Sequence, residues 1–400
     1  MSEHQQRFKV IVGGSGPAAI EAALDLRQLA GALVETTIVT PDEECVHLPM
    51  TVLAPFARSG ATRYPLAELV NDAGAILHRG TIASVDPATR AVHTADGEML
   101  AYDALLVAIG GVQQFPYPRA LAYGGPGADE RMHGLIQDIE AGYLKRVAFV
   151  VAPGVSWPLP LYELALMTAE RADEMCARVE LTLVTPETSA LELFGPDTAR
   201  AVGGLLDAAA ITLRTNTRAE VPTGTLVELQ PQGERLRVDR VVTLPTLTGP
   251  RIDGLPHDDD GFLPVDPHGR VRGTPGVYAA GDATDFAIKQ GGIACQHADA
   301  AAEHIAARAG APIEPEPFAP VLRGMLLTER WARFMRRDAE ADATVAGRAL
   351  WWPPTKIAGR ELAGYLEGLD EEAGRRSGLP AAVSAGNAGS ESIEVLSLKP

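Results

Sequence analysis

A glycine-rich turn near the N-terminus carries the first pattern with the chemistry to bind a ligand. Gly14, Gly16 and Ala19 stand in the spacing GxGxxA. They follow the apolar run Phe8–Val12 and lead into a helical pattern over Ala18–Ala30. Between a strand and a helix, Gly14 permits a tight turn and Gly16 lets a pyrophosphate approach the backbone. The small side chain of Ala19 keeps the helix close to the sheet. The turn therefore predicts a dinucleotide site at a helix N-terminus; the alternative is a glycine turn without a ligand.

An acidic residue after the next strand would complete such a site by holding ribose hydroxyls. The second strand is predicted over Thr36–Thr40, and three carboxylates follow it as Asp42, Glu43 and Glu44. Asp42 or Glu43 is expected to reach the ribose from this loop. An equally weighted alternative is that these carboxylates are solvated turn charges.

The same order of elements recurs about 145 residues later. Arg146–Val151 predicts a buried strand, Tyr162–Cys176 a helix and Val179–Thr185 the next strand. The two second strands also end alike, in TTIVTPDEE at 36–44 and in LTLVTPETS at 181–189. We interpret this as two related βαβ units of parallel, doubly wound sheets, although chance similarity is an alternative.

Composition narrows the function classes. With 35 Lys and Arg against 52 Asp and Glu, the net charge of −17 argues against nucleic acids and anionic lipid surfaces. The three cysteines, Cys45, Cys176 and Cys295, cannot build a disulfide framework and lack the spacing of a metal site, so no metal is predicted. Without a signal peptide or an apolar span, a cytoplasmic location is expected. Peripheral attachment at the inner face of the membrane stays open.

Further segments resemble the flavin-binding motifs of a known family. Tyr102–Gly111 resembles the strand that closes the flavin domain in two-dinucleotide flavoproteins, and Gly261–Asp266 with Thr274–Ala283 resembles their second flavin motif. The motifs stand in the family's order, so residues 8–310 resemble the FAD-dependent pyridine nucleotide-disulfide oxidoreductase superfamily. The resemblance implies FAD as the cofactor.

The resemblance also implies roles for single residues. Asp282 matches the aspartate that hydrogen bonds a ribityl hydroxyl, and the predicted helix Gly291–Arg308 would direct its N-terminus at the flavin. Lys289 matches a lysine near the flavin and is the candidate catalytic residue, because its charge would stabilise the anionic reduced ring; a surface lysine at a helix cap is the alternative. The cofactor-binding candidates are Gly14, Ser15, Gly16, Pro17, Ala18, Asp42, Ile82, Gly110, Gly281, Asp282, Lys289 and Gln290.

The resemblance predicts an α/β fold with two Rossmann-type, three-layer dinucleotide-binding domains and a small C-terminal module. The proline-rich stretch at 312–320 would link that module to the rest. The predicted boundaries are 1–112 and 250–312 for the discontinuous FAD-binding domain, 113–249 for the NAD(P)-binding-like domain, 313–369 for the C-terminal module and 370–400 for a mostly disordered tail.

The absence of CxxC and CxxxxC pairs decides between branches of the superfamily. The layout is closer to sulfide:quinone oxidoreductases, flavocytochrome c sulfide dehydrogenases and type II NADH dehydrogenases. Segment 151–163 resembles the sulfide-oxidising branch, but Trp157 stands near the point where that branch has a reactive cysteine. Cys295 would then have no partner and is interpreted as a small buried hydrophobic residue.

A second nucleotide site is predicted only weakly. Of the second glycine motif Gly154 alone is present, and the prolines at 153, 158 and 160 lack the N–H groups that would face a pyrophosphate. Glu187 could still hold a ribose and would favour NADH over NADPH. NAD(P)H therefore stays open as the donor, and the alternative is a closed domain shell with Trp157 packed near the flavin.

Other candidates have weaker support. Gln296, His297 and His47 could border the flavin or an acceptor, although an ordinary helix face or loop is at least as good an interpretation. Trp351 and Trp352 could line an acceptor pocket or an interface, but packing of the module is favoured. The basic run Arg330, Arg333, Arg336 and Arg337 could touch a membrane, but a solvated surface is favoured.

The predicted function is an FAD-dependent oxidoreductase. It passes two electrons from a reductant, with NAD(P)H among the candidates, to a quinone-like or other small acceptor. One alternative is a sulfide or sulfur-compound oxidoreductase that uses Cys45 or Cys295 singly. Another is a non-catalytic flavin-binding protein that relays electrons to a docked partner. The expected partners are a small-molecule donor and acceptor, with a homodimer left open.

Overall fold

A parallel five-stranded sheet forms the centre of the first half of the fold. The computed structural model describes residues 7–58, 62–125, 127–328, 331–338 and 343–377. The sheet has the order β20 (Val277–Ala279), β9 (Ala104–Val107), β1 (Phe8–Gly13), β2 (Val34–Thr40) and β5 (Ile76–Arg79). Its strands are apolar runs because both faces are covered. Residues on either side of the 113–249 segment therefore share one sheet.

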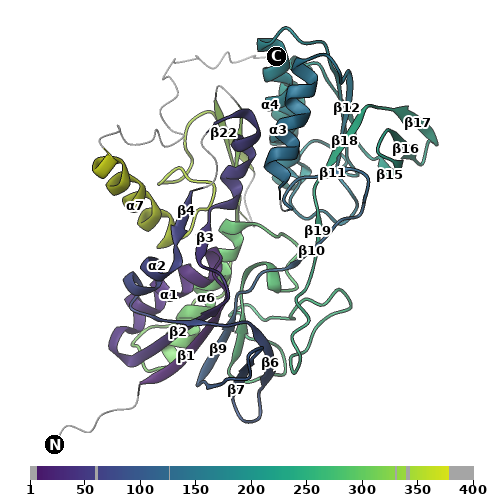
Figure 1. The fold of residues 1–400 in the computed structure, drawn as a ribbon. Coiled ribbons are helices and arrows are strands. Elements are labelled where there is room, and N and C mark those ends of the chain that lie inside the picture. The colour runs from purple at the N-terminus through teal and green to yellow at the C-terminus, as the bar shows by residue number, and fades with distance from the viewer. Residues whose placement is uncertain (1–6, 59–61, 126, 329–330, 339–342, 378–400) are drawn as a thin grey trace, which may run out of the picture.

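Helices and a small antiparallel sheet cover the two faces. Helices α1 (Pro17–Ala30) and α6 (Gly291–Arg308) lie together on one face (Figure 1). Their contact is rich in buried alanines, which allow the two helices to approach closely. The other face packs against β6 (Ile82–Asp86), β7 (Ala91–Thr94) and β8 (Met99–Ala101). Loop segments and α2 (Leu66–Asp72) complete this lobe.

A second parallel sheet repeats this plan. Its order is β11 (Leu121–Ala122), β18 (Arg240–Thr243), β12 (Arg146–Val150), β13 (Glu180–Val184) and β14 (Ile211–Arg214). The helices are α3 (Ala128–Glu140), α4 (Leu159–Glu174) and α5 (Pro196–Ala208). The antiparallel strands are β15 (Arg218–Thr223), β16 (Leu226–Gln230) and β17 (Glu234–Arg237). Two layered Rossmann-type units are therefore present, which confirms the predicted fold class.

Two short strands join the lobes, and a third group of strands packs against both. The antiparallel pair β10 (Val112–Gln114) and β19 (Thr246–Thr248) runs between the sheets (Figure 1). The C-terminal strands are β21 (Val321–Leu327), β22 (Ala332–Asp338) and β23 (Thr344–Ala346), followed by α7 (Leu362–Ser377). Apolar residues of β21 share a core with α4 and with the start of α6. Whether these parts fold as separate domains stays a prediction.

Two predicted boundaries differ from the structure. The helix expected over Tyr162–Cys176 begins at Leu159, because prolines are tolerated in the first turn of a helix. The end of the C-terminal module at Leu369 was wrong, because α7 continues to Ser377 and the Asp370 carboxylate accepts a hydrogen bond from the Tyr64 hydroxyl. The rest of the predicted tail, 378–400, lies outside the described residues.

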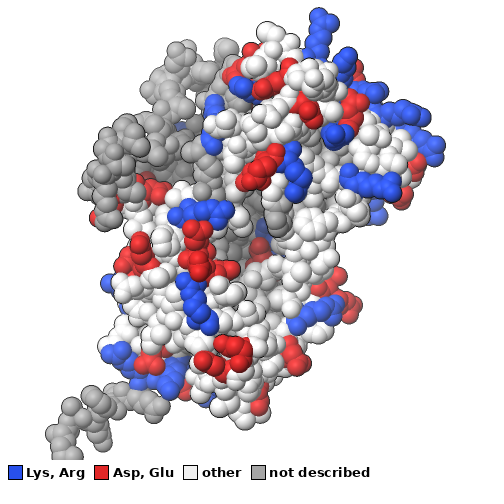
Figure 2. All heavy atoms as spheres, viewed as in Figure 1, with Lys and Arg blue, Asp and Glu red and all other residues white. Residues whose placement is uncertain are grey.

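The helices and the surface charge bear on the expected membrane contact. Among the described residues, no helix is both long and apolar enough to cross a bilayer. Figure 2 shows acidic and basic side chains interspersed on the visible face. Arg333, Arg336 and Arg337 lie on β22, where Arg336 pairs with Asp338. Arg330 lies outside the described residues.

Candidate functional site

Residues of the sequence motifs line one cavity of about 720 Å³. Its walls come from the turn after β1, the end of β2, the loop after β9, the start of α6, the start of α4 and the C-terminal module. All twelve cofactor-binding candidates line it: Gly14, Ser15, Gly16, Pro17, Ala18, Asp42, Ile82, Gly110, Gly281, Asp282, Lys289 and Gln290. The volume lies within the range of ligand sites.

Two glycines of the first turn have different tasks. Gly14 has φ +121°, and a Cβ placed on it would lie 2.2 Å from the backbone oxygen of Ala108, so only glycine fits between β1 and β9. Gly16 has φ −79°, and a Cβ there would meet no protein atom within 4 Å. The space in front of Gly16 therefore belongs to the cavity and suits a pyrophosphate.

The structure distinguishes between the two ribose candidates. The Asp42 carboxylate lines the cavity and accepts hydrogen bonds from the hydroxyls of Ser15 and Thr40. These bonds fix the loop after β2 against the turn after β1. Glu43 does not line the cavity, so Asp42 is the better placed carboxylate.

Asp282 and Lys289 bring opposite charges to the cavity. Burial raises the pKa of Asp282, and the Lys289 cation opposes that shift. Burial lowers the pKa of Lys289 to about 8, although the neighbouring carboxylates act to raise it. Its Nζ lies 3.8 Å from the ring centroid of Phe262 and donates to the Thr284 carbonyl. Lys289 is therefore a largely buried cation that still carries its charge at neutral pH.

The N-terminus of α6 closes another part of the cavity wall. Gln290 caps the helix, since its Oε1 accepts a hydrogen bond from the Ile293 N–H at 2.8 Å. Its Nε2 lies 3.4 Å from the carbonyl oxygens of Arg323 and Lys356. Gln290 therefore joins the first Rossmann-type unit to the C-terminal module and holds the helix dipole toward the cavity.

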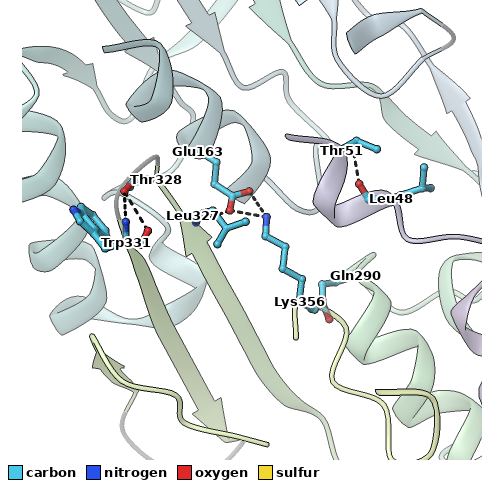
Figure 3. Close-up of polar contacts among 8 residues, drawn as sticks. All are labelled: Leu48, Thr51, Glu163, Gln290, Leu327, Thr328, Trp331 and Lys356. Atoms are coloured by element: carbon cyan, nitrogen blue, oxygen red, sulfur yellow. Dashed lines mark hydrogen bonds and ion pairs between the residues drawn. The ribbon is translucent and has the colours of Figure 1, made fainter. Parts of the chain in front are cut away.

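A buried ion pair on the cavity wall was not predicted from the sequence. Lys356 Nζ lies 2.6 and 2.7 Å from the two carboxylate oxygens of Glu163, and the Leu327 N–H donates to the same carboxylate (Figure 3). The two side chains are 5% and 0% exposed. Burial raises the pKa of Glu163 and lowers that of Lys356, and each charge opposes the shift of the other. One signal was present in the sequence: Glu163 interrupts the apolar run LPLYELALM.

The second nucleotide site is only partly open. Gly154 and Glu187 do not line the cavity, whereas Ser156 and Trp157 do. The Glu187 carboxylate is buried and accepts hydrogen bonds from the hydroxyls of Tyr162 and Thr185 at 2.6 and 2.8 Å. Both hydrogen bonds reach Oε2, whereas the buried Oε1 has no hydrogen-bond partner among the described residues. Burial raises the pKa of Glu187.

The cysteine candidates are poor nucleophiles. Both Cys45 and Cys295 are buried, and burial raises the pKa of Cys45 to about 11 and that of Cys295 well above its ordinary value. At neutral pH both are therefore thiols rather than reactive thiolates. This geometry argues against sulfur chemistry that uses either cysteine singly.

The remaining polar candidates do not line the 720 Å³ cavity. The Gln296 side chain bonds the backbone of Val321, and His297 packs between the rings of Phe286 and Phe318. Neither lines the 720 Å³ cavity, and both lie on α6, so the suggested contact with an acceptor stays a prediction. His47 is not a lining residue either, and burial lowers its pKa to about 4.

The residues present fit FAD. The cavity offers an open approach to Gly16 and a carboxylate at Asp42 on the side of the first turn. On the other side, the half-buried Asp282 carboxylate receives no hydrogen bond from any described group, so a ligand hydroxyl would satisfy it. When bound, FAD supplies the two-electron chemistry of the site.

Comparisons with known proteins agree with this site. The profile of the pyridine nucleotide-disulphide oxidoreductase family matches residues 8–303. An NADH dehydrogenase-like protein of Mycobacterium tuberculosis is 28% identical over 293 residues, covering 68% of this chain and 72% of that protein. The demethylphylloquinone reductase NdbB of Synechocystis is 24% identical over 308 residues, covering 71% and 73%. The structure of sulfide:quinone oxidoreductase from Aquifex aeolicus has the same fold, with a TM-score of 0.78, 18% identity and coverage of 94% and 93%.

The two glycines of the first turn give a matched test of the cavity. Gly14→Ala should lower the free energy of unfolding of the apoprotein by about 1–3 kcal/mol, because the turn needs a positive φ. Gly16→Ala should change it by less than about 0.5 kcal/mol but weaken FAD binding at least ~10-fold, because the added methyl group projects into the cavity. Urea unfolding and FAD titration measure the two effects. Unchanged FAD affinity in Gly16→Ala would contradict this placement.

Proposed function

The chain belongs to the pyridine nucleotide-disulphide oxidoreductase family, and from this premise we propose that it transfers two electrons from NADH to a quinone. It is an FAD-dependent oxidoreductase with small-molecule donors and acceptors. The observation that best supports this proposal is one cavity, whose walls come from both Rossmann-type units and from the C-terminal module. The names of the relatives, NADH dehydrogenase-like protein and demethylphylloquinone reductase, support the donor and the acceptor.

The donor and acceptor are proposed to use different walls of this cavity. The donor would approach the wall at Ser156 and Trp157, in the segment between β12 and α4 of the second Rossmann-type unit. The acceptor would approach the wall at Lys356 and Met325 from the C-terminal module. FAD would lie between them along the first turn and Asp282. The arrangement keeps the two substrates apart while each reaches the same ring system.

Proton balance gives Lys356 a proposed role. Reduction of a quinone to a quinol takes two electrons and two protons, whereas NADH supplies a hydride, which carries two electrons and one proton. The second proton must come from solvent through the protein. Lys356 Nζ holds protons at the cavity wall, and Glu163 stabilises its charged form at 2.6 Å. This pair is therefore placed to hold the proton that the acceptor needs.

A second candidate function has its own supporting observation. Glu187 is buried and does not line the cavity, and prolines at 158 and 160 leave few N–H groups at the start of α4. These features favour a donor that lacks an adenine dinucleotide. Such a donor would reduce the flavin from the same wall at Trp157. Peripheral membrane contact and a homodimer, also expected from the sequence, stay predictions.

An anaerobic titration of the flavin separates these candidates. NADH should bleach the visible flavin absorbance with one equivalent per FAD, and a water-soluble quinone should restore it. NADPH should be weaker, because a carboxylate such as Glu187 repels a 2′-phosphate. Sulfide serves as the control donor, and it should not bleach because neither buried cysteine is a thiolate. Bleaching by none of the nicotinamides would overturn the proposed donor.

The role of Lys289 predicts a shift of flavin potential. Lys289→Met should lower the two-electron midpoint potential by about 20–60 mV, since a nearby cation stabilises the reduced anion by about 1–3 kcal/mol. Lys289→Arg keeps the charge and should lie close to the wild type. Lys145→Met, which removes an exposed lysine, is the matched control. Equal potentials for Lys289→Met and Lys145→Met would contradict a tuning role.

A further inference from the structure

A second, smaller cavity lies in the C-terminal module. Its volume is about 200 Å³, and its walls come from α6, β21 and the segment 351–363. Among the described residues, Arg323 alone lines both this cavity and the flavin cavity. The small cavity is therefore a neighbour of the flavin cavity rather than an extension of it, and Arg323 stands in the shared wall.

Arg323 brings a half-buried guanidinium with one unpaired N–H to the small cavity. Its Nε is buried and has no hydrogen-bond partner among the described residues. The residue opposite it on β22 is Arg336, whose own Nε is paired with Asp338 at 3.1 Å. Burial and the Arg336 cation lower the pKa of Arg323, and the carboxylates of Asp338 and Asp299 oppose that shift. A buried guanidinium N–H in such a place gains free energy from an anionic oxygen, because leaving a buried donor unpaired is costly.

The protein's own carboxylate in this cavity does not serve as that anion. A carboxylate oxygen of Asp299 lies within 4.8 Å of a carboxylate oxygen of Glu21 and of one of Asp25. Burial and these two neighbours raise the pKa of Asp299, so it is a neutral acid at neutral pH. The other guanidinium in the wall, Arg360, is already paired with Asp25 at 2.9 Å and Glu303 at 2.6 Å. Among the described residues, Arg323 Nε therefore remains a buried donor without a hydrogen-bond partner.

Aromatic side chains form the other side of the cavity. Trp351 donates its indole N–H to the Thr355 carbonyl at 2.9 Å, so its ring presents apolar surface. Trp352 is 80% exposed, which is unusual for so large an apolar side chain. A flat ring seated on these indoles would cover part of that surface. A cavity of ~150 Å³ accommodates benzene, so about 200 Å³ has room for one ring with a small substituent.

We propose that this cavity binds a monocyclic aromatic carboxylate, with the carboxylate on Arg323 and the ring against Trp351 and Trp352. The guanidinium supplies charge-assisted hydrogen bonds to the ligand carboxylate. A neutral amide of the same shape lacks the charge and binds more weakly. The site is independent of which donor or acceptor the flavin uses.

Calorimetric titration of the FAD-loaded protein with benzoate tests this site. Benzoate should bind once per chain and at least ~10-fold more tightly than benzamide. Arg323→Gln should weaken benzoate binding at least ~10-fold and abolish its preference over benzamide. Arg337→Gln, which removes an exposed arginine of β22, should bind benzoate as the wild type does. No measurable benzoate binding, or equal binding by Arg323→Gln, overturns the proposal.

Because Arg323 also lines the flavin cavity, a second variant locates the ligand. Trp352 lines the small cavity and not the flavin cavity. Trp352→Ala should retain its full FAD content, which reports folding, and should bind benzoate several-fold more weakly. Unchanged benzoate binding by Trp352→Ala would place the ligand in the flavin cavity and overturn the assignment.

Discussion

The buried pair of Glu163 and Lys356 is the interaction on which the shape of the cavity depends. A buried charge is stable only with its partner, so each side chain fixes the place of the other. Glu163 belongs to α4 of the second Rossmann-type unit, and Lys356 belongs to the C-terminal module. The Leu327 N–H adds β21 to the same carboxylate. Gln290 then ties the Lys356 carbonyl to the start of α6. All three parts of the fold therefore meet at one polar contact.

This contact also shapes the electrostatics of the cavity. The chain as a whole carries a net charge of −17, yet two of its lysines, Lys289 and Lys356, line the cavity. Burial lowers the pKa of both, and neighbouring carboxylates oppose the shift. The cavity wall thus holds two buried lysine cations, each beside a carboxylate, in surroundings of low dielectric constant. Such a place suits a cofactor whose reduced form is an anion, and a substrate that must be protonated.

Local sequence predicted the parts of the site that local backbone geometry determines. The turn at Gly14 and Gly16, the carboxylate at Asp42 and the segment of Asp282 are set by residues close together in the chain. The ion pair was missed because Glu163 and Lys356 are 193 residues apart and no spacing pattern links them. The hydrogen bond from Tyr162 to Glu187 was equally hidden, since Tyr162 lies on the neighbouring helix. The bonds between Gln296 and Val321 were hidden as well, because a helical pattern does not say which neighbour a side chain meets.

A double-mutant cycle on the buried pair tests the central claim most directly. The free energy of unfolding in urea is measured for the FAD-loaded wild type, Glu163→Gln, Lys356→Met and the double variant. Each single change should cost about 3–5 kcal/mol, because it leaves the other charge buried without its partner. The double variant should cost clearly less than the sum, with a coupling of roughly 1–3 kcal/mol. Additive costs would show that the pair does not hold the three parts together and would contradict this account.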